Sequence, residues 1–213
     1  NQVETLLKDN LWKSDDLSDY DEKYYREWAH EIPPLIHILR DTVLDVHHNL
    51  YLPISGRALD ISLFKSGSIR VKEQHTVLDP ADTVLHSIIH LFMNEDFTNA
   101  FRDLYDLYLL MKEFDSAKFW QRISAVASET GYSKEVYYCL KILNLVFKLP
   151  PPNIYISLES RYKNRFTDFF INAILIRAIT PKHNLMDTLS IKVARSVIFM
   201  RGHFLKMPAH ILL

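Results

Sequence analysis

From Asp79 to about residue 201, apolar side chains recur every three or four positions, which is the spacing of amphipathic α-helices. Prolines at 150–152 and at Pro181 divide this part of the chain, so it predicts several packed helices. In front of it, residues 34–39 and 42–48 are rich in β-type residues. We therefore predict an α+β fold, in which a small antiparallel β element precedes a mostly helical bundle.

The limits of the helices follow from local start and stop signals. Asp79 before Pro80 is an N-cap followed by proline at the first helical position. Gly131 is a typical residue just beyond a helix C-terminus. The further helices are predicted from near Thr98, from Ser116 to Glu129, from Lys134 to Lys148 with Ser133 as N-cap, over 162–179 and over 186–201.

The first 75 residues are expected to form a partial α/β domain, 1–75, followed by a helical domain, 76–213. The short connection at Arg40-Asp41 favours an antiparallel hairpin of the strands 34–39 and 42–48. The other expectations are a helix over 2–9, a solvated acidic loop over 15–22, a strand or irregular segment over 24–32, an apolar turn at 60–64 and a small strand over 68–72.

Composition restricts the class of protein. With 48% hydrophobic and 24% charged residues, the 213-residue chain has the balance of a soluble globular protein. Its net charge of −1 does not indicate a protein that binds nucleic acid. A single cysteine, Cys139 in a helical pattern, favours a reducing, cytoplasmic setting and a packing role. The best apolar run, Phe169 to Ile179, is shorter than the roughly 20 residues of a membrane span.

The predicted strand 42–48 carries an acid in an apolar run. With a period of two, Val43, Asp45 and His47 point to one face of the strand. Asp45 and His47 on a rigid strand suit a general base or a metal-binding group. The alternative is an edge strand with one polar face, and spacing alone favours that alternative.

Two helices offer further polar pairs. His86 and His90 are four residues apart, which is the spacing of a zinc-type pair, but Ser87 stands where a His-Glu-x-x-His motif has glutamate. Partly buried, satisfied histidines are therefore the favoured interpretation. Arg102 and Asp106 suit a surface ion pair, and the functional alternative has Asp103 or Asp106 facing the hairpin. No glycine-rich phosphate loop is present among the 4 glycines.

The order of short motifs resembles an uncharacterised bacterial nucleotidyltransferase-like family within the DNA polymerase β-type nucleotidyltransferase superfamily. The motifs are His30-Glu31-Ile32-Pro33-Pro34-Leu35, Leu44-Asp45-Val46-His47, Leu78 to His86, His90-Leu91-Phe92, Phe101 to Leu107, and Arg201 to Pro208. Together they span most of the chain. The resemblance implies Mg²⁺-dependent transfer of a nucleotidyl group from an NTP to an acceptor hydroxyl, with the helical bundle on the acceptor side.

In that superfamily, an Asp-x-Asp pair on one strand and a third acid on a neighbouring strand hold the Mg²⁺ ions. By position Asp45 resembles the third acid, which makes it the expected metal ligand and catalytic residue, and His47 matches a recurrent family position. A Gly-Ser motif and the Asp-x-Asp strand are expected before Asn1. Either that part is missing from this sequence or the protein is a degenerate member of the family, and in both cases the chain is expected to be inactive by itself. Asp19-Tyr20-Asp21 has the Asp-x-Asp spacing but lies in a polar stretch that is not predicted as a strand, so it is not assigned to the metal site. The alternative is a non-catalytic binding module for a protein or peptide partner.

Overall fold

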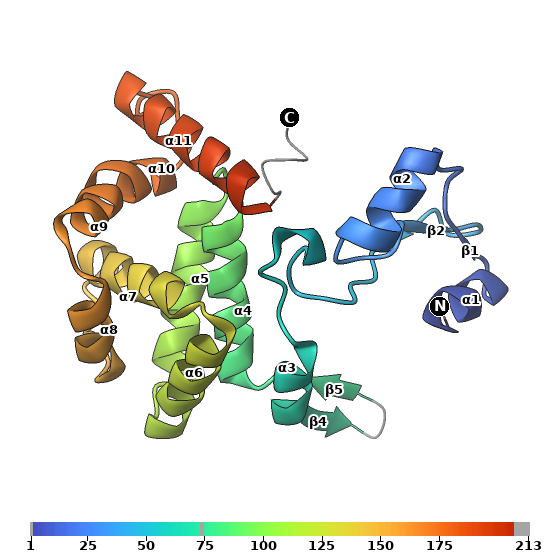
Figure 1. The fold of residues 1–213 in the computed structure, drawn as a ribbon, viewed down its shortest axis with the longest axis horizontal. Helices are drawn as coiled ribbons and strands as arrows, with labels where there is room; N and C mark the ends of the chain where they lie inside the picture. The colour runs from blue at the N-terminus through green and yellow to red at the C-terminus, as the bar shows by residue number, and fades with distance from the viewer. Residues whose placement is uncertain (1, 73–74, 207–213) are drawn as a thin grey trace. The chain divides into compact units, whose positions relative to one another are not determined.

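The computed structural model describes residues 2–72 and 75–206. The described chain is mostly helical and contains a three-stranded and a two-stranded antiparallel sheet (Figure 1). The predicted α+β fold with a small β element and a mostly helical body is therefore confirmed. Contacts divide the chain into two compact units, one up to Ile61 and one over Ser62–Leu205. The domains 1–75 and 76–213 stay a prediction, because compactness does not demonstrate independent folding.

The first unit combines short helices with the three-stranded sheet, in the order β1-β2-β3. Leu35 pairs with Leu44, and Trp12 pairs with His37, so β2 lies between two antiparallel neighbours. In chain order its elements are α1 (Gln2–Asp9), β1 (Trp12–Lys13), α2 (Asp19–Lys23), the π-helical turn η1 (Tyr24–Trp28), β2 (Leu35–His37), β3 (Val43–Leu44) and the 3₁₀ turn η2 (Pro53–Ser55).

The predicted helix 2–9 and the predicted antiparallel hairpin are confirmed, but the hairpin is shorter than expected. The carbonyl of His37 accepts from the backbone N–H groups of Arg40 and Asp41, at 3.2 and 2.9 Å, and closes a wider turn than a two-residue connection. Asp41 has a positive φ of 51°, which aspartate tolerates better than most residues. The two-residue strand β1 was not predicted, since so short a segment has no readable alternation.

Two expectations for the acidic and aromatic segments were wrong. The stretch 15–22 is not a loop throughout, because Ser18 caps α2 by accepting from the N–H of Asp21 at 3.1 Å. Three acids in the first turn of α2 add a favourable interaction with the helix dipole. Residues 24–28 continue this helix as η1 and are not extended. The chain becomes extended only at Ala29 (φ −75°, ψ 163°).

A charged pair joins α1 to η1. Glu4 is 7% exposed, and the guanidinium of Arg26 donates to both of its carboxylate oxygens, at 2.7 and 3.0 Å. Hydrogen bonding to Arg26 holds the pKa of Glu4 at about 2, below its ordinary value of 4.5. The two helical segments are 22 positions apart in sequence, so this pair fixes a tertiary contact of the first unit.

Glu4→Gln is expected to lower the free energy of unfolding at pH 7 by about 1–3 kcal/mol, because a charge-assisted bidentate contact is lost. Since the folded state lowers the pKa of Glu4, its contribution is complete above pH 4.5 and disappears as the pH falls towards about 2. Urea denaturation at several pH values measures this. Glu22→Gln is the control, because Glu22 contacts the same Arg26 with a side chain 50% exposed. Equal losses in both variants would contradict the assignment.

The second unit is a helical body with the small β4-β5 hairpin at its start, in which Ile69 pairs with Val77. Its elements are α3 (Ile61–Gly67), β4 (Ile69–Lys72), β5 (His75–Val77), α4 (Pro80–Met93), α5 (Ala100–Glu113), α6 (Ala117–Thr130), α7 (Ser133–Phe147), α8 (Ile154–Tyr162), α9 (Arg165–Phe169), the π-helical turn η3 (Phe170–Leu175), α10 (Ile176–Ile179) and α11 (Leu189–Lys206). The hairpin confirms the strand predicted over 68–72.

Helix α4 is the centre of the second unit, because α5, α6 and α7 all pack against it (Figure 1). Its side chains Val84, Leu85, Ile88 and Ile89 are fully buried, which explains why its apolar stripe is so wide. Cys139 on α7 is buried in the same core, and burial raises the pKa of its thiol. The predicted packing role of Cys139 is thus confirmed. Among the described residues, no helix is long and apolar enough to cross a membrane.

The capping signals at Asp79, Ser116 and Gly131 were confirmed, whereas the one at Ser133 was wrong. Asp79 accepts from the N–H of Ala81 at 2.9 Å at the start of α4, and Ser116 and Gly131 flank α6. Ser133 is not an N-cap, since it lies inside α7 and Tyr132 occupies that position. The helix predicted over 162–179 is present as the uninterrupted segment α9, η3 and α10, which begins at Arg165, and its N-cap Asn164 accepts from Thr167 N at 2.9 Å. The separate helix α8, which ends at Tyr162, was not predicted.

The segment that was expected to be an apolar turn at 60–64 is the helix α3, and a buried ion pair fixes it. Asp82 on α4 is fully buried, and Arg122 on α6 donates to both of its carboxylate oxygens, at 3.0 and 2.7 Å. Arg122 also donates to the carbonyl of Leu63 at 2.7 Å. A Cβ on Gly67 would lie 2.5 Å from the Arg122 guanidinium, so a side chain at position 67 would displace the pair.

Arg122→Met is expected to destabilise the second unit by about 3–5 kcal/mol, because it leaves the buried Asp82 carboxylate without its cation. The double variant Asp82→Asn/Arg122→Met is the control. It is expected to be more stable than Arg122→Met, because the buried charge is then absent. Thermal and urea denaturation of the three proteins measure this. A double variant less stable than the single variant would contradict the role of Arg122 in neutralising Asp82.

Candidate functional site

Asp45 and His47 follow directly after β3, on the segment that was predicted as strand 42–48. Regular pairing covers only Val43–Leu44 of this segment, with one isolated bridge at His47. The alternation of faces nevertheless extends further: Val43, Asp45 and His47 are exposed, whereas Leu44 and Val46 are half-buried. Asp45 and His47 therefore share a face, as predicted, and that face is the exposed one.

A second antiparallel contact brings His30 and Glu31 to the same place. The N–H of Ile32 donates to the carbonyl of Val46 at 3.0 Å, and the N–H of His48 donates to the carbonyl of His30 at 2.8 Å. Glu31 and His47 lie opposite each other between these two bonds, as a non-hydrogen-bonded pair. Side chains are closest together in pairs of this kind. Pro33 and Pro34 have no N–H, so the pairing is interrupted after Ile32 and resumes where Leu35 pairs with Leu44.

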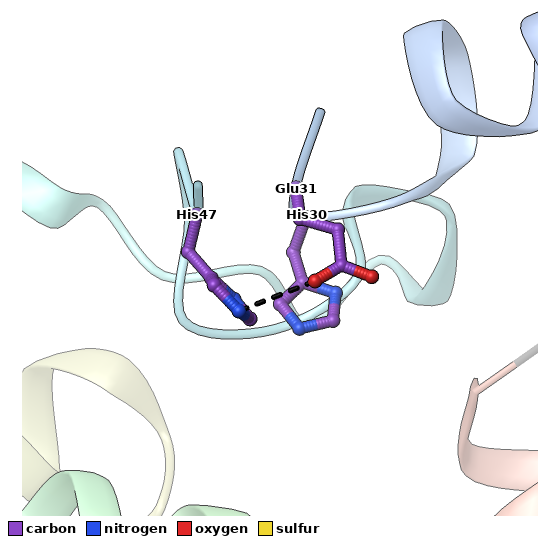
Figure 2. Close-up of side chains that lie close together, drawn as sticks. All are labelled: His30, Glu31 and His47. Atoms are coloured by element: carbon purple, nitrogen blue, oxygen red, sulfur yellow. Dashed lines mark ion pairs between the residues drawn. The ribbon is translucent and has the colours of Figure 1, made fainter. Parts of the chain in front are cut away.

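The side chains of His30, Glu31 and His47 point toward one another (Figure 2). The Nε2 of His47 lies 3.2 Å from a carboxylate oxygen of Glu31. The rings of His30 and His47 meet at an angle of 62°, with centroids 4.8 Å apart. One ligand atom from each of the three residues lies within 4.8 Å of the other two. We call these three residues the His-Glu-His cluster.

Negative charge gathers around Tyr25, a half-buried residue of η1. Burial raises the pKa of the Tyr25 hydroxyl, and the carboxylates of Glu31, Asp21 and Asp45 raise it further, in that order of effect. The negative charges of Asp45 and of the His-Glu-His cluster therefore act on one hydroxyl. An anionic surface of this kind favours the approach of cations.

Glu31→Gln is expected to lower the pKa of Tyr25, because a neighbouring negative charge is removed. Asp45→Asn is expected to lower it as well, but less. Asp41→Asn on the hairpin turn is the control and is expected to leave the pKa unchanged. NMR titration of ¹³C-labelled tyrosine measures the three values. A Tyr25 pKa equal to that of the wild type in both Glu31→Gln and Asp45→Asn would contradict the arrangement.

The second unit holds the other polar residues that were predicted from the sequence. His86 and His90 on α4 and Arg102, Asp103 and Asp106 on α5 line a groove of about 310 Å³, together with Ser87, Leu107 and Leu110. His86 is half-buried and His90 is exposed, and their ring centroids are 6.3 Å apart. Within residues 2–72 and 75–206, these histidines do not belong to a close group of three metal-binding side chains.

The prediction of an ion pair between Arg102 and Asp106 was wrong. Arg102 contacts its neighbour Asp103 instead, with 3.1 Å between guanidinium nitrogen and carboxylate oxygen. Both residues lie at the first turns of α5, and Asp106 lines the groove. The alternative in which Asp103 or Asp106 faces the hairpin stays a prediction, because these residues and the hairpin belong to different units.

Fold and site together define an α+β protein whose first unit presents carboxylate and imidazole side chains on one exposed face. An uncharacterised nucleotidyltransferase family matches residues 1–148. Since this match covers more than half of the 213 residues, the chain belongs to that family. The resemblance drawn from the motifs is thereby confirmed. No curated protein and no solved structure matches the chain.

The matched range includes the motifs around His30, Asp45, His86 and His90. The motif Arg201 to Pro208 lies beyond it, and Met207 and Pro208 also lie outside the residues that the structure describes.

Sequence reasoning alone did not assign a role to His30, Glu31 or Tyr25. His30 and Glu31 are adjacent in sequence, and in a regular strand they would point to opposite faces. They lie in a segment that was expected to be strand or irregular, and the sequence did not indicate which strand would pair with it. The sequence feature that could have indicated the cluster is the presence of histidine-containing segments, 30–31 and 47–48, on either side of the predicted hairpin. The register of the hairpin pairs Leu35 with Leu44, and its continuation would place Glu31 opposite His48. The observed pairing of Glu31 with His47 is shifted by one residue, so the hairpin alone does not predict it.

Proposed function

We propose that this protein transfers a nucleotidyl group from an NTP to an acceptor hydroxyl and that Asp45 contributes a carboxylate to the Mg²⁺–NTP site. The observation that carries the proposal is the family match over residues 1–148, which includes Asp45 and His47. Nucleotidyl transfer needs an anionic group that can reach a metal-bound phosphate chain. Asp45 is an exposed carboxylate on an ordered segment next to β3, so it fits this requirement.

The donor set around Asp45 suits a hard cation. Mg²⁺ binds through one or two carboxylates together with substrate phosphates and water. Asp45 and Asp21 supply carboxylates near the Tyr25 hydroxyl, and both are exposed. When bound, Mg²⁺ neutralises phosphate charge and lowers the pKa of the attacking hydroxyl. Asp45 in this proposal holds the cation and thereby orients the phosphates.

His47 receives a positioning role in this proposal. Its Nε2 is engaged with Glu31 at 3.2 Å, so that nitrogen is not available to take a proton from the acceptor. Its backbone lies opposite Glu31 in the isolated bridge. His47 therefore holds the segment that carries Asp45 against residues 30–32. An immobilised carboxylate loses less entropy when it binds a metal than a mobile one.

We propose that the groove of α4 and α5 in the second unit binds a small polar molecule. The groove has a volume of about 310 Å³ and offers imidazole, guanidinium and carboxylate groups from His86, His90, Arg102, Asp103 and Asp106. These groups can donate to and accept from the hydroxyls of a small polar molecule. Apolar side chains of Leu107 and Leu110 complete its lining, which is the usual mixture in small-molecule sites.

In the full-length protein, Asp45→Asn is expected to lower the rate of NTP-dependent pyrophosphate release on the order of 100-fold or more, as for other losses of transition-state charge stabilisation. Calorimetric titration with NTP and Mg²⁺ is expected to show weaker binding as well. Asp41→Asn is the matched control, since Asp41 is an exposed aspartate on the neighbouring turn. It is expected to retain the activity of the wild type.

Wild-type activity in Asp45→Asn would remove Asp45 from the metal site. A wild-type protein that gives no heat with NTP and Mg²⁺ would contradict the whole proposal. That result would favour the alternative of a non-catalytic binding module with a protein or peptide partner.

A further inference from the structure

We propose that His30, Glu31 and His47 form a binding site for a transition-metal ion, Zn²⁺ or a chemically similar divalent ion. This site is separate from the Mg²⁺–NTP site assigned to Asp45. It rests on the geometry of the His-Glu-His cluster and stands whether or not the protein transfers nucleotidyl groups. Within the described ranges 2–72 and 75–206, this cluster is the one group of three histidine, cysteine or acidic side chains close enough to share an ion.

The ligand types select the metal. Two imidazole nitrogens and one carboxylate oxygen suit Zn²⁺ and its neighbours in the first transition series, whereas Mg²⁺ takes oxygen ligands. Three protein ligands also leave one position of a tetrahedral ion open. The site therefore belongs to the class of sites that retain a water molecule or a ligand anion.

The separations between ligand atoms are close to those of a metal site. In a tetrahedral Zn²⁺ site with bonds of about 2.0–2.1 Å, neighbouring ligand atoms lie roughly 3.3–3.4 Å apart. The distance from His47 Nε2 to Glu31 Oε2 is 3.2 Å. The remaining separations of the cluster are within 4.8 Å. In this proposal the side chain of His30 approaches the other two ligands when the ion binds.

The backbone that carries the cluster is already fixed. The carbonyl of His30 accepts from the N–H groups of His48 and Asn49, at 2.8 and 3.1 Å. The N–H of Ile32 donates to Val46, and Ile32 itself is buried. Both sides of the cluster are therefore held in register by hydrogen bonds on either side of the Glu31–His47 pair. Preorganisation of this kind increases metal affinity, because little ordering remains to be done on binding.

The cluster is accessible to an ion from solution. The side chain of His47 is 49% exposed and that of Glu31 is 25% exposed. The competing interpretation is a His–Glu ion pair with no ligand. Exposed pairs of that kind contribute about 0–1 kcal/mol and do not require a second histidine. The ring of His30 lies edge-on against that of His47, so a third metal-binding side chain lies beside the pair.

Titration of the tag-free, full-length protein with Zn²⁺ and with Co²⁺, in the absence of NTP, tests the proposal. Calorimetry measures affinity and stoichiometry, and the visible absorption of bound Co²⁺ reports its coordination geometry. One strongly bound ion with the intense bands of a four-coordinate site is expected for the wild type. His30→Ala, Glu31→Gln and His47→Ala are each expected to weaken binding more than 10-fold, since loss of a supporting group alone costs 10–100-fold.

His48→Ala and His75→Ala are the matched controls, because both histidines are exposed and lie outside the cluster. They are expected to bind as the wild type does. Circular dichroism and thermal unfolding without metal identify any variant that fails to fold, and Glu31→Gln keeps the size of the side chain. The absence of stoichiometric binding in the wild type would overturn the proposal, and so would equal binding by folded cluster variants. Loss of Zn²⁺ binding in His30→Ala with unchanged NTP binding would support two separate sites, because His30 has no role in the proposed Mg²⁺–NTP site.

Discussion

The antiparallel contact between residues 30–32 and 46–48 is the interaction on which the site of the first unit depends. Two backbone hydrogen bonds, Ile32 N to Val46 O and His48 N to His30 O, enclose the Glu31–His47 pair. They bring together segments that the hairpin of β2 and β3 separates in sequence. Asp45 lies on the same exposed face as His47, so one short contact positions both the proposed Mg²⁺ ligand and the His-Glu-His cluster.

Buried acids and exposed acids have different surroundings in this protein. In the second unit Asp82 is fully buried, and Arg122 donates to both of its oxygens, which neutralises it inside the core. In the first unit Glu31 and Asp45 remain accessible, and their charge raises the pKa of Tyr25 together with burial and Asp21. A buried carboxylate needs its cationic partner to remain charged, whereas an accessible carboxylate can bind a cation from solution. This difference separates structural acids from candidate functional acids.

Local capping signals explain which helices could be predicted. Asp79 with Pro80, and Ser116 with Gly131, lie within one turn of the helix ends that they define, so α4 and α6 were found nearly complete. Helix α8 was not, because its β-type residues Ile154, Tyr155 and Ile156 conceal a helix that packs on α7. The aromatic residues of η1 likewise favoured a strand in the prediction, although the segment is helical. In both cases tertiary contacts outweigh intrinsic propensity.

The candidate site could be predicted only in part. Period-two spacing placed Asp45 and His47 on one face, and the order of motifs identified the family. Neither property indicates that His30 and Glu31 lie beside His47. That depends on the register of two segments about 16 positions apart, which long-range backbone hydrogen bonds set.

The sequence by itself determined the fold class, the helical character after Asp79, the buried role of Cys139 and membership of the nucleotidyltransferase family. Those properties follow from composition, periodicity and ordered short motifs, all of which are local in the chain. Only the tertiary structure decided that Asp45 is exposed, that Asp82 is neutralised by Arg122, and that two histidines and a glutamate converge. Burial and side-chain proximity arise from contacts between distant segments, which no local pattern records.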